Sequence, residues 1–118
     1  MTNTNEKRRA AIYARIPFPH DPSAQEALDL QVTLCQERAE SQSYTIDAQH
    51  IYREIGGVLT APDKREQFAA LTTAAKRHEF DLVLVYSFGF LSSKQNHIQQ
   101  ATTALRQHGV VIEVLSDV

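Results

Sequence analysis

The sequence predicts an α/β fold in which helices cover both faces of a mostly parallel, four-stranded sheet. Apolar runs typical of strands alternate along the chain with segments whose apolar residues recur at helical spacing. The run Asp81–Tyr86 has no polar interruption between Leu82 and Val85, as expected of a strand covered on both faces. Such an alternation favours parallel strands in a three-layer α/β/α arrangement, and the strand order 2-1-3-4 is compatible with it.

The first strand and the first helix are the best defined elements of the N-terminal half. Ala10–Arg15 is a short apolar run and predicts the first strand. A helix is expected from Ser23 to about Ser41, because Ser23 and Glu26 have the spacing of a capping box. Tyr44–Tyr52 gives a weaker strand signal. The predicted buried stripe of the helix comprises Ala24, Ala27, Leu28, Leu34, Cys35 and Ala39.

The second helix follows a glycine-containing loop. Asp63 and Glu66 are placed to cap its N-terminus, and the strand Asp81–Tyr86 comes after it. This order gives the second strand–helix–strand unit of the fold. The predicted buried face of the helix comprises Phe68, Leu71, Ala74 and Ala75.

The last helix and strand complete the alternation. Ser92 and Gln95 form another capping-box pattern, and Gly109 suits the left-handed position that ends helices. Val110–Leu115 predicts the final strand. The apolar positions of this helix are Ile98, Ala101 and Leu105.

Length and composition predict one domain at residues 10–118, preceded by a flexible polar tail at 1–9. A formal net charge of -2 argues against a protein that binds nucleic acid on its own. The single cysteine, Cys35, excludes an intramolecular disulfide and indicates the cytoplasm. No apolar run approaches the ~20 residues of a membrane-spanning helix. The histidines lack metal-ligand spacing, so neither a metal nor a cofactor is expected.

Several segments, taken in order, carry a resemblance to a known family. They are Ala11-Ile12-Tyr13-Ala14-Arg15, Leu28-Asp29-Leu30-Gln31 with Cys35, Asp63-Lys64-Arg65, Glu79-Phe80-Asp81-Leu82-Val83-Leu84-Val85-Tyr86, and Gly109-Val110-Val111-Ile112. The ordered set resembles the catalytic domain of serine recombinases, the resolvases and invertases, over about residues 10 to 117. The resemblance implies a resolvase-like fold and a site for a DNA phosphate at the carboxyl edge of the sheet.

The resemblance also implies that this site has lost most of its reactive groups. In the family, a serine two residues after the first-strand arginine attacks the phosphate, and a D-R-L-S-R motif after the third strand supplies an aspartate and two arginines. Retained positions of the implied site are Arg15, Gln31 and Arg65; changed positions are Pro17, Gly89, Phe90 and Ser93.

Proline at position 17 has neither a hydroxyl nor a backbone N–H, so no catalytic residue is expected at that point. Ser23 is better explained as a helix cap than as a replacement, and Ser87 has no evident base. Arg15 is expected either to bind an anion or to pair with a carboxylate such as Glu54, and the sequence leaves both open.

The segment Tyr86–Leu91 puts two phenylalanines and a leucine where the family has charged residues. These side chains are expected either to fill the space left by the lost polar groups or to form an apolar surface that binds a protein. The candidate interface residues are Phe88 and Phe90, with Phe18 from the proline-rich loop that is expected to face them. The sequence also ends before the long dimerising helix and the DNA-binding region implied by the resemblance, so DNA contact by the domain alone is expected to be weak.

The favoured hypothesis is a catalytically inactive recombinase-like domain that acts through a protein partner or self-association, in a context of DNA recombination or mobile elements. Two alternatives stay open. One is a divergent recombinase that keeps some DNA-phosphate chemistry. The other is a small anion- or nucleotide-binding module that uses Arg15 and Arg65.

Overall fold

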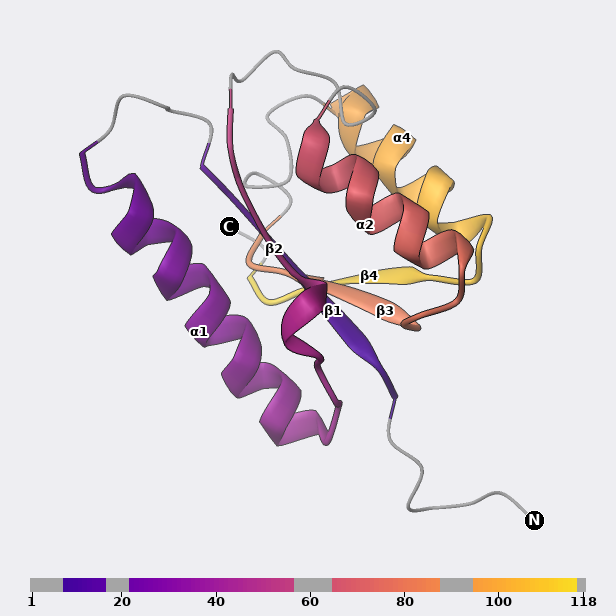
Figure 1. Ribbon diagram of the computed structural model, residues 1–118, viewed down its shortest axis with the longest axis horizontal. Helices are drawn as coiled ribbons and strands as arrows, with labels where there is room; N and C mark the ends of the chain where they lie inside the picture. The colour runs from indigo at the N-terminus through magenta and orange to yellow at the C-terminus, as the bar shows by residue number, and fades with distance from the viewer. Residues whose placement is uncertain (1–7, 17–21, 57–64, 88–94, 117–118) are drawn as a thin grey trace.

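The computed structural model describes residues 8–16, 22–56, 65–87 and 95–116, and these form a parallel sheet flanked by helices (Figure 1). The sheet has four strands in the order β2-β1-β3-β4. Every neighbouring pair is parallel. The predicted fold class and strand order are confirmed. The strands are β1 (Ala10–Ile16), β2 (Ile51–Ile55), β3 (Leu82–Val85) and β4 (Val111–Val114).

The described helices lie on both faces of the sheet, as predicted. Helix α1 (Ala24–Gln42) covers one face, and helices α2 (Glu66–Lys76) and α4 (Gln95–Arg106) lie together over the other (Figure 1). The pleat of β1 divides its side chains between two apolar cores. Ile12 and Ala14 pack on the α1 side, whereas Ala11 and Tyr13 pack on the side of α2 and α4.

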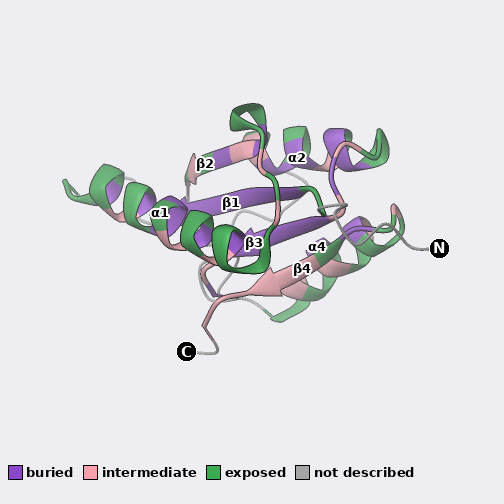
Figure 2. Ribbon diagram, turned by 90° about the horizontal axis from the view of Figure 1, so that it is seen from below, coloured by how far each residue is buried: buried purple, intermediate pink, exposed green. Residues whose placement is uncertain are grey.

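The two central strands are buried throughout, and the edge strand β4 is more exposed (Figure 2). This matches the unbroken apolar runs of β1 and β3, because a strand with helices on both faces has no solvent side. The predicted buried face of α2 is confirmed at all four positions, and Ala101 and Leu105 of α4 are buried as expected. Cys35 is buried in the α1 core, as predicted.

The second strand begins later than the sequence pattern suggests, so the predicted range Tyr44–Tyr52 is wrong. β2 starts at Ile51, because Ala48–His50 form a turn of 3-10 helix. The weak strand signal rests on the alternation of Ile46, Ala48 and His50, but His50 is buried for another reason. His50 is buried there, with its ring edge-on to Phe80 and its Nε2 2.9 Å from a carboxylate oxygen of Glu79.

The ends of the helices only partly follow their sequence signals. Ser23 precedes α1, but its side chain makes no capping hydrogen bond and its φ of -98° and ψ of 12° are not those of a typical cap, so the predicted capping box is wrong. Gly109 does adopt the left-handed conformation predicted for it, with φ of 76°. Asp63 and Ser92, the other expected caps, lie outside the described residues. None of the described helices has the length and apolarity needed to cross a membrane.

Candidate functional site

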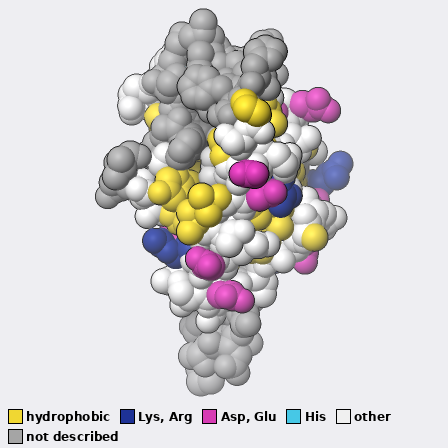
Figure 3. Space-filling model, turned by 90° about the vertical axis from the view of Figure 1, so that its left-hand side faces the viewer, with side chains coloured by type: hydrophobic (Ala, Val, Ile, Leu, Met, Phe, Trp, Pro, Cys, Tyr) yellow, Lys and Arg dark blue, Asp and Glu magenta, His cyan; other side chains and the backbone are white. Residues whose placement is uncertain are grey.

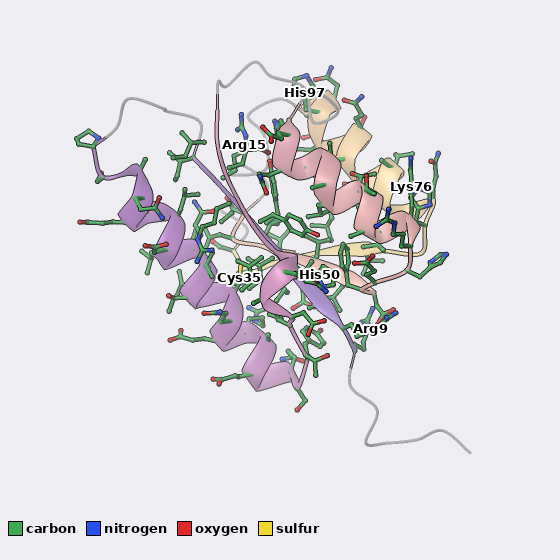
Figure 4. The ribbon with its side chains drawn as sticks, viewed as in Figure 1. Arg9, Arg15, Cys35, His50, Lys76 and His97 are labelled. Atoms are coloured by element: carbon green, nitrogen blue, oxygen red, sulfur yellow. The ribbon has the colours of Figure 1, made fainter. Side chains whose placement is uncertain are left out.

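Arg15 lies near the carboxyl end of the central strand, where ligands bind in open parallel sheets. Beyond Ile12, β1 pairs only with β2, because the ladder to β3 covers just Ala10–Ile12. Figure 4 shows Arg15 beside the first turn of α2. The side chain is only 1% exposed, which is unusual for arginine.

Gln31 of α1 holds the backbone of this same residue. Its Oε1 accepts a hydrogen bond from the Arg15 N–H, and its Nε2 donates one to the Arg15 carbonyl oxygen, both at 3.2 Å. In parallel sheets, successive residues direct their backbone groups to opposite neighbours. The Arg9 carbonyl oxygen accepts a hydrogen bond from the backbone N–H of Asp81, which directly precedes β3. The Ile16 carbonyl oxygen accepts one from the backbone N–H of Gly56, which directly follows β2. The Arg15 groups therefore face the β3 side, and Gln31 satisfies them where the β3 ladder has ended.

Glu54 joins β2 to the start of α2. It lies opposite Arg15 in the β1–β2 register. One carboxylate oxygen accepts a hydrogen bond of 2.6 Å from the Tyr13 hydroxyl and one of 3.3 Å from the Phe68 N–H. The other accepts a hydrogen bond of 2.8 Å from the Gln67 N–H. Because the first N–H groups of a helix lack partners within it, this remote carboxylate caps α2.

Arg65 precedes the first turn of α2 and is 3% exposed. Burial lowers the pKa of the Arg15 guanidinium, and the nearby positive charge of Arg65 lowers it further, whereas Tyr13 and Glu54 oppose both effects by less. Burial, followed by the Glu54 carboxylate, raises the pKa of Tyr13 well above its usual range, and Arg65 partly opposes this. The described part of the site thus combines two arginines, one carboxylate and a neutral phenol.

These features have a counterpart among known protein families. The family model described as "Resolvase, N terminal domain" matches residues 10–118. The chain belongs to the resolvase N-terminal domain family. Its sheet order and its helices on both faces are therefore those of a serine recombinase-like domain.

Solved structures support the fold of this resolvase-family domain. The C-terminal catalytic domain of ISC1926 TnpA, an IS607-like serine recombinase, has a TM-score of 0.79 and 22% identity, over 92% of this chain and 71% of that one. The N-terminal catalytic domain of TP901-1 integrase has a TM-score of 0.78 and 20% identity, over 92% of this chain and 78% of that one. A resolvase family site-specific recombinase from Streptococcus pneumoniae has a TM-score of 0.75 and 16% identity, over 92% of this chain and 72% of that one. Among curated protein sequences, none matches with significant similarity.

The three positions that the family resemblance implies as retained, Arg15, Gln31 and Arg65, come together in space. Gln31 binds the Arg15 backbone, and Arg65 is close enough that its positive charge lowers the pKa of the Arg15 guanidinium. Ser87, considered above as a replacement nucleophile, is 2% exposed. The changed and interface positions Pro17, Phe18, Phe88, Gly89, Phe90 and Ser93 lie outside the described residues. Within the described ranges, no group of three or more potential metal ligands occurs.

The sequence pattern does not identify Tyr13 as a member of the site in this resolvase-family domain, and it indicates Glu54 only as a possible partner for Arg15. The signal that could have identified Tyr13 is its position two residues before Arg15, because side chains at this spacing share one face of a strand. The cap that Glu54 provides to α2 has no sequence signal, because the two segments meet only in the folded structure.

Proposed function

We propose that this resolvase-family domain does not cleave DNA and serves as a protein-interaction or regulatory module in DNA recombination or mobile-element biology. The observation that carries the proposal is the burial of Arg15 two residues before Pro17. An arginine that is 1% exposed is poorly placed to contact a DNA phosphate, and Pro17 has no hydroxyl that could attack one.

The retained polar groups are used within the fold. Gln31 completes the backbone hydrogen bonding of Arg15, and Glu54 caps α2 while it accepts from Tyr13. Each interaction has a structural use that needs no substrate. Retention of these residues is therefore compatible with a domain that no longer performs chemistry.

The energetics of phosphate transfer support the same proposal. The transition state carries negative charge on the phosphate oxygens, and fixed positive donors stabilise it. Removal of one such donor costs roughly 2.7–4 kcal/mol in other enzymes. Phe90 and Ser93 stand where the family resemblance implies arginines, so two donors are missing in addition to the nucleophile.

The direct test is incubation of the purified chain with supercoiled plasmid, followed by electrophoresis and mass spectrometry for nicks and protein–DNA adducts. We expect neither. Wild-type serine recombinase with its own recombination site serves as the positive control. A covalent adduct at any residue would establish the divergent recombinase instead, and its position would identify the nucleophile.

Stepwise restoration tests why cleavage is absent. Pro17→Ser restores a hydroxyl alone, and we expect no adduct from it because the arginine positions remain changed. The combination of Pro17→Ser, Gly89→Asp, Phe90→Arg and Ser93→Arg restores the whole implied set. A comparison of the two variants separates loss of the nucleophile from loss of charge stabilisation. An adduct from Pro17→Ser alone would contradict the assigned importance of the arginines.

A second candidate function is the binding of a small phosphate-containing anion. Arg15, Arg65 and the N-terminus of α2 bring positive charge together, and among the described residues of this cluster Glu54 supplies the carboxylate. Thermal unfolding with inorganic phosphate tests it, with chloride at equal ionic strength as the control. Stabilisation by phosphate that disappears in Arg65→Gln would favour the anion-binding module; equal melting in both salts would remove this candidate.

A further inference from the structure

Helix α1 exposes an apolar surface that the sheet does not cover. Ala27, Leu30 and Leu34 follow one another on this helix. With Ile16 and Tyr86, and with Gln31 as the one polar residue, they line a hollow of about 240 Å³. We call the five residues other than Gln31 the α1 patch. Leu30 is 59% exposed, the largest fraction for any large hydrophobic residue in the described ranges. Figure 3 shows hydrophobic side chains gathered on this side of the molecule, with acidic side chains around them.

The helix that carries the α1 patch is acidic. Glu26, Asp29, Glu37 and Glu40 lie on α1, and Arg38 is its one basic residue. Arg38 forms an ion pair of 3.3 Å with Glu113 of β4, so its charge is already matched. Asp29 lies 3.4 Å from Arg53, with both side chains largely exposed, so this contact leaves most of the acidic character in place.

The opposite face of the sheet carries a second opening, between α2 and α4. It has a volume of about 290 Å³. We call it the α2–α4 groove. Its walls are mostly small or unbranched side chains, so another surface can approach the helices closely. The lining residues are Phe68, Ala69, Thr72, Thr73, Lys76, Gln100, Ala101 and Ala104.

The charge near this groove is opposite to that of α1. Lys76 lines one end of the groove, and Arg77 follows it directly. Figure 4 shows Lys76 at the end of α2 remote from Arg15. Helix α4 contains no carboxylate between Gln95 and Arg106. Glu66 lies in the first turn of α2, away from Lys76.

We propose that the α1 patch of one copy docks in the α2–α4 groove of a second copy. Apolar contact by Leu30 would be joined by attraction between the carboxylates of α1 and Lys76 with Arg77. Helix α1 lies on one face of the sheet and helices α2 and α4 lie on the other (Figure 1), so the patch and the groove face opposite ways. The contact is therefore heterologous, and each bound copy keeps one unused patch or groove for a further copy.

This inference names a partner for the proposed interaction module and so rests on that function. A second copy is favoured over an unrelated protein because one chain supplies both complementary surfaces. The arrangement predicts head-to-tail chains or rings rather than a two-fold dimer. It also predicts weaker association at high salt, because the charges around both surfaces are exposed.

The contact is tested by sedimentation velocity of the full chain from micromolar to millimolar concentration. We expect wild type to form a concentration-dependent series of oligomers. Leu30→Asp on the patch and Ala69→Glu in the groove should each weaken self-association by about tenfold or more. Both sites are exposed, so circular dichroism should show intact folding.

Two controls carry the same new charges elsewhere. Gln36→Asp lies on α1 outside the patch, and Ala70→Glu lies on α2 outside the groove; both residues are exposed. Each should associate like wild type. Equal weakening by the controls would show a general effect of added charge and overturn the contact.

Mixing the two interface variants gives the sharpest test. Leu30→Asp retains a working groove, and Ala69→Glu retains a working patch, so the mixture should form a 1:1 complex and stop there. A mixture that stays monomeric, or one that grows beyond two copies, would contradict the assigned pairing. If the wild type is monomeric, the proposed contact is wrong, but the proposal that the domain does not cleave DNA is unaffected. If a DNA adduct forms, the proposal about cleavage is wrong, and sedimentation still tests the contact.

Discussion

Gln31 makes with Arg15 the two backbone hydrogen bonds that a neighbouring strand would otherwise make. Both bonds are 3.2 Å, and both groups are buried. They occur where β1 has passed the last residue paired with β3. A side-chain amide carries one donor and one acceptor in the same arrangement as a peptide group, so it can extend a ladder by one step. The position of Arg15 therefore depends on α1 as well as on the sheet.

Replacement of Gln31 should lower the stability of the domain markedly. Gln31→Leu keeps approximate size but leaves the buried N–H and C=O of Arg15 without these partners, and each unsatisfied group costs about 1–3 kcal/mol. We expect the free energy of unfolding in urea to fall by about 2 kcal/mol or more. Gln36→Leu is the matched control at an exposed position of the same helix and should change it by less than about 0.5 kcal/mol. Equal effects would contradict the role assigned to Gln31.

Neutralising Glu54 should weaken the start of α2. Glu54→Gln removes a charged acceptor that binds two backbone N–H groups of this helix and the Tyr13 hydroxyl. We expect a loss of about 1–2 kcal/mol in the free energy of unfolding. Hydrogen exchange should also quicken at Gln67 and Phe68. The exposed Glu40→Gln on α1 serves as the control, and unchanged exchange at the start of α2 would argue against the cap.

Tyr13 and Glu54 should be energetically coupled. Tyr13→Phe keeps the edge-on ring contact with Phe68, at 5.4 Å between centroids, and removes the 2.6 Å hydrogen bond to Glu54. We expect a cost of about 1 kcal/mol. In a double-mutant cycle with Glu54→Gln, the combined loss should be smaller than the sum of the single losses. Additive losses would show that the two groups act independently.

Stability should fall at alkaline pH through Cys35. Burial raises the pKa of its thiol from 9.0 to about 12, with Arg38 in partial opposition. The unfolded chain releases this proton at lower pH than the folded chain. The stability that the protonated thiol contributes is therefore fully present below pH 9 and is lost as pH rises toward about 12. The slope from this group approaches about 1.4 kcal/mol per pH unit. Urea unfolding between pH 8 and 10 should show a shallower decline in Cys35→Ala, and an identical decline would place the cause elsewhere.

Ser43 offers a stabilising substitution. It ends α1 with φ of 61° and ψ of 35°, a left-handed conformation that side chains disfavour. Ser43→Gly should raise the free energy of unfolding by about 0.5–1 kcal/mol. Ser41→Gly is the control two residues earlier, inside the helix, and should lower it by a similar amount. A loss at both positions would show that the Ser43 side chain contributes more than its backbone strain costs.

The fold was predictable because its signals are local and repeated. The apolar runs of β1 and β3 and the helical spacing of Phe68, Leu71 and Ala75 reflect burial, which each segment records in its own sequence. The start of β2 was not predictable. The alternation through His50 resembles a strand, but there the chain forms a 3-10 turn whose histidine packs against Phe80.

The site was predictable only where the family resemblance assigned residues to it. Arg15, Gln31 and Arg65 do lie together, but their partners come from contacts between distant segments. Glu54 caps a helix that begins 12 positions later, at Glu66, and no pattern around Arg65 records this. Ser23 carries a strong capping signal and makes no such bond. At the start of α2, the cap comes from a contact across the fold and not from a neighbouring residue.

The amide of Gln31 has a consequence for how such a domain evolves. Since it completes the backbone hydrogen bonding of β1, selection for folding alone is enough to retain it, whether or not the domain cleaves DNA. A glutamine at this position therefore has a use in the scaffold that is independent of recombinase activity. Genomic surveys that seek working members of the family should weigh position 17 and positions 89 to 93 instead.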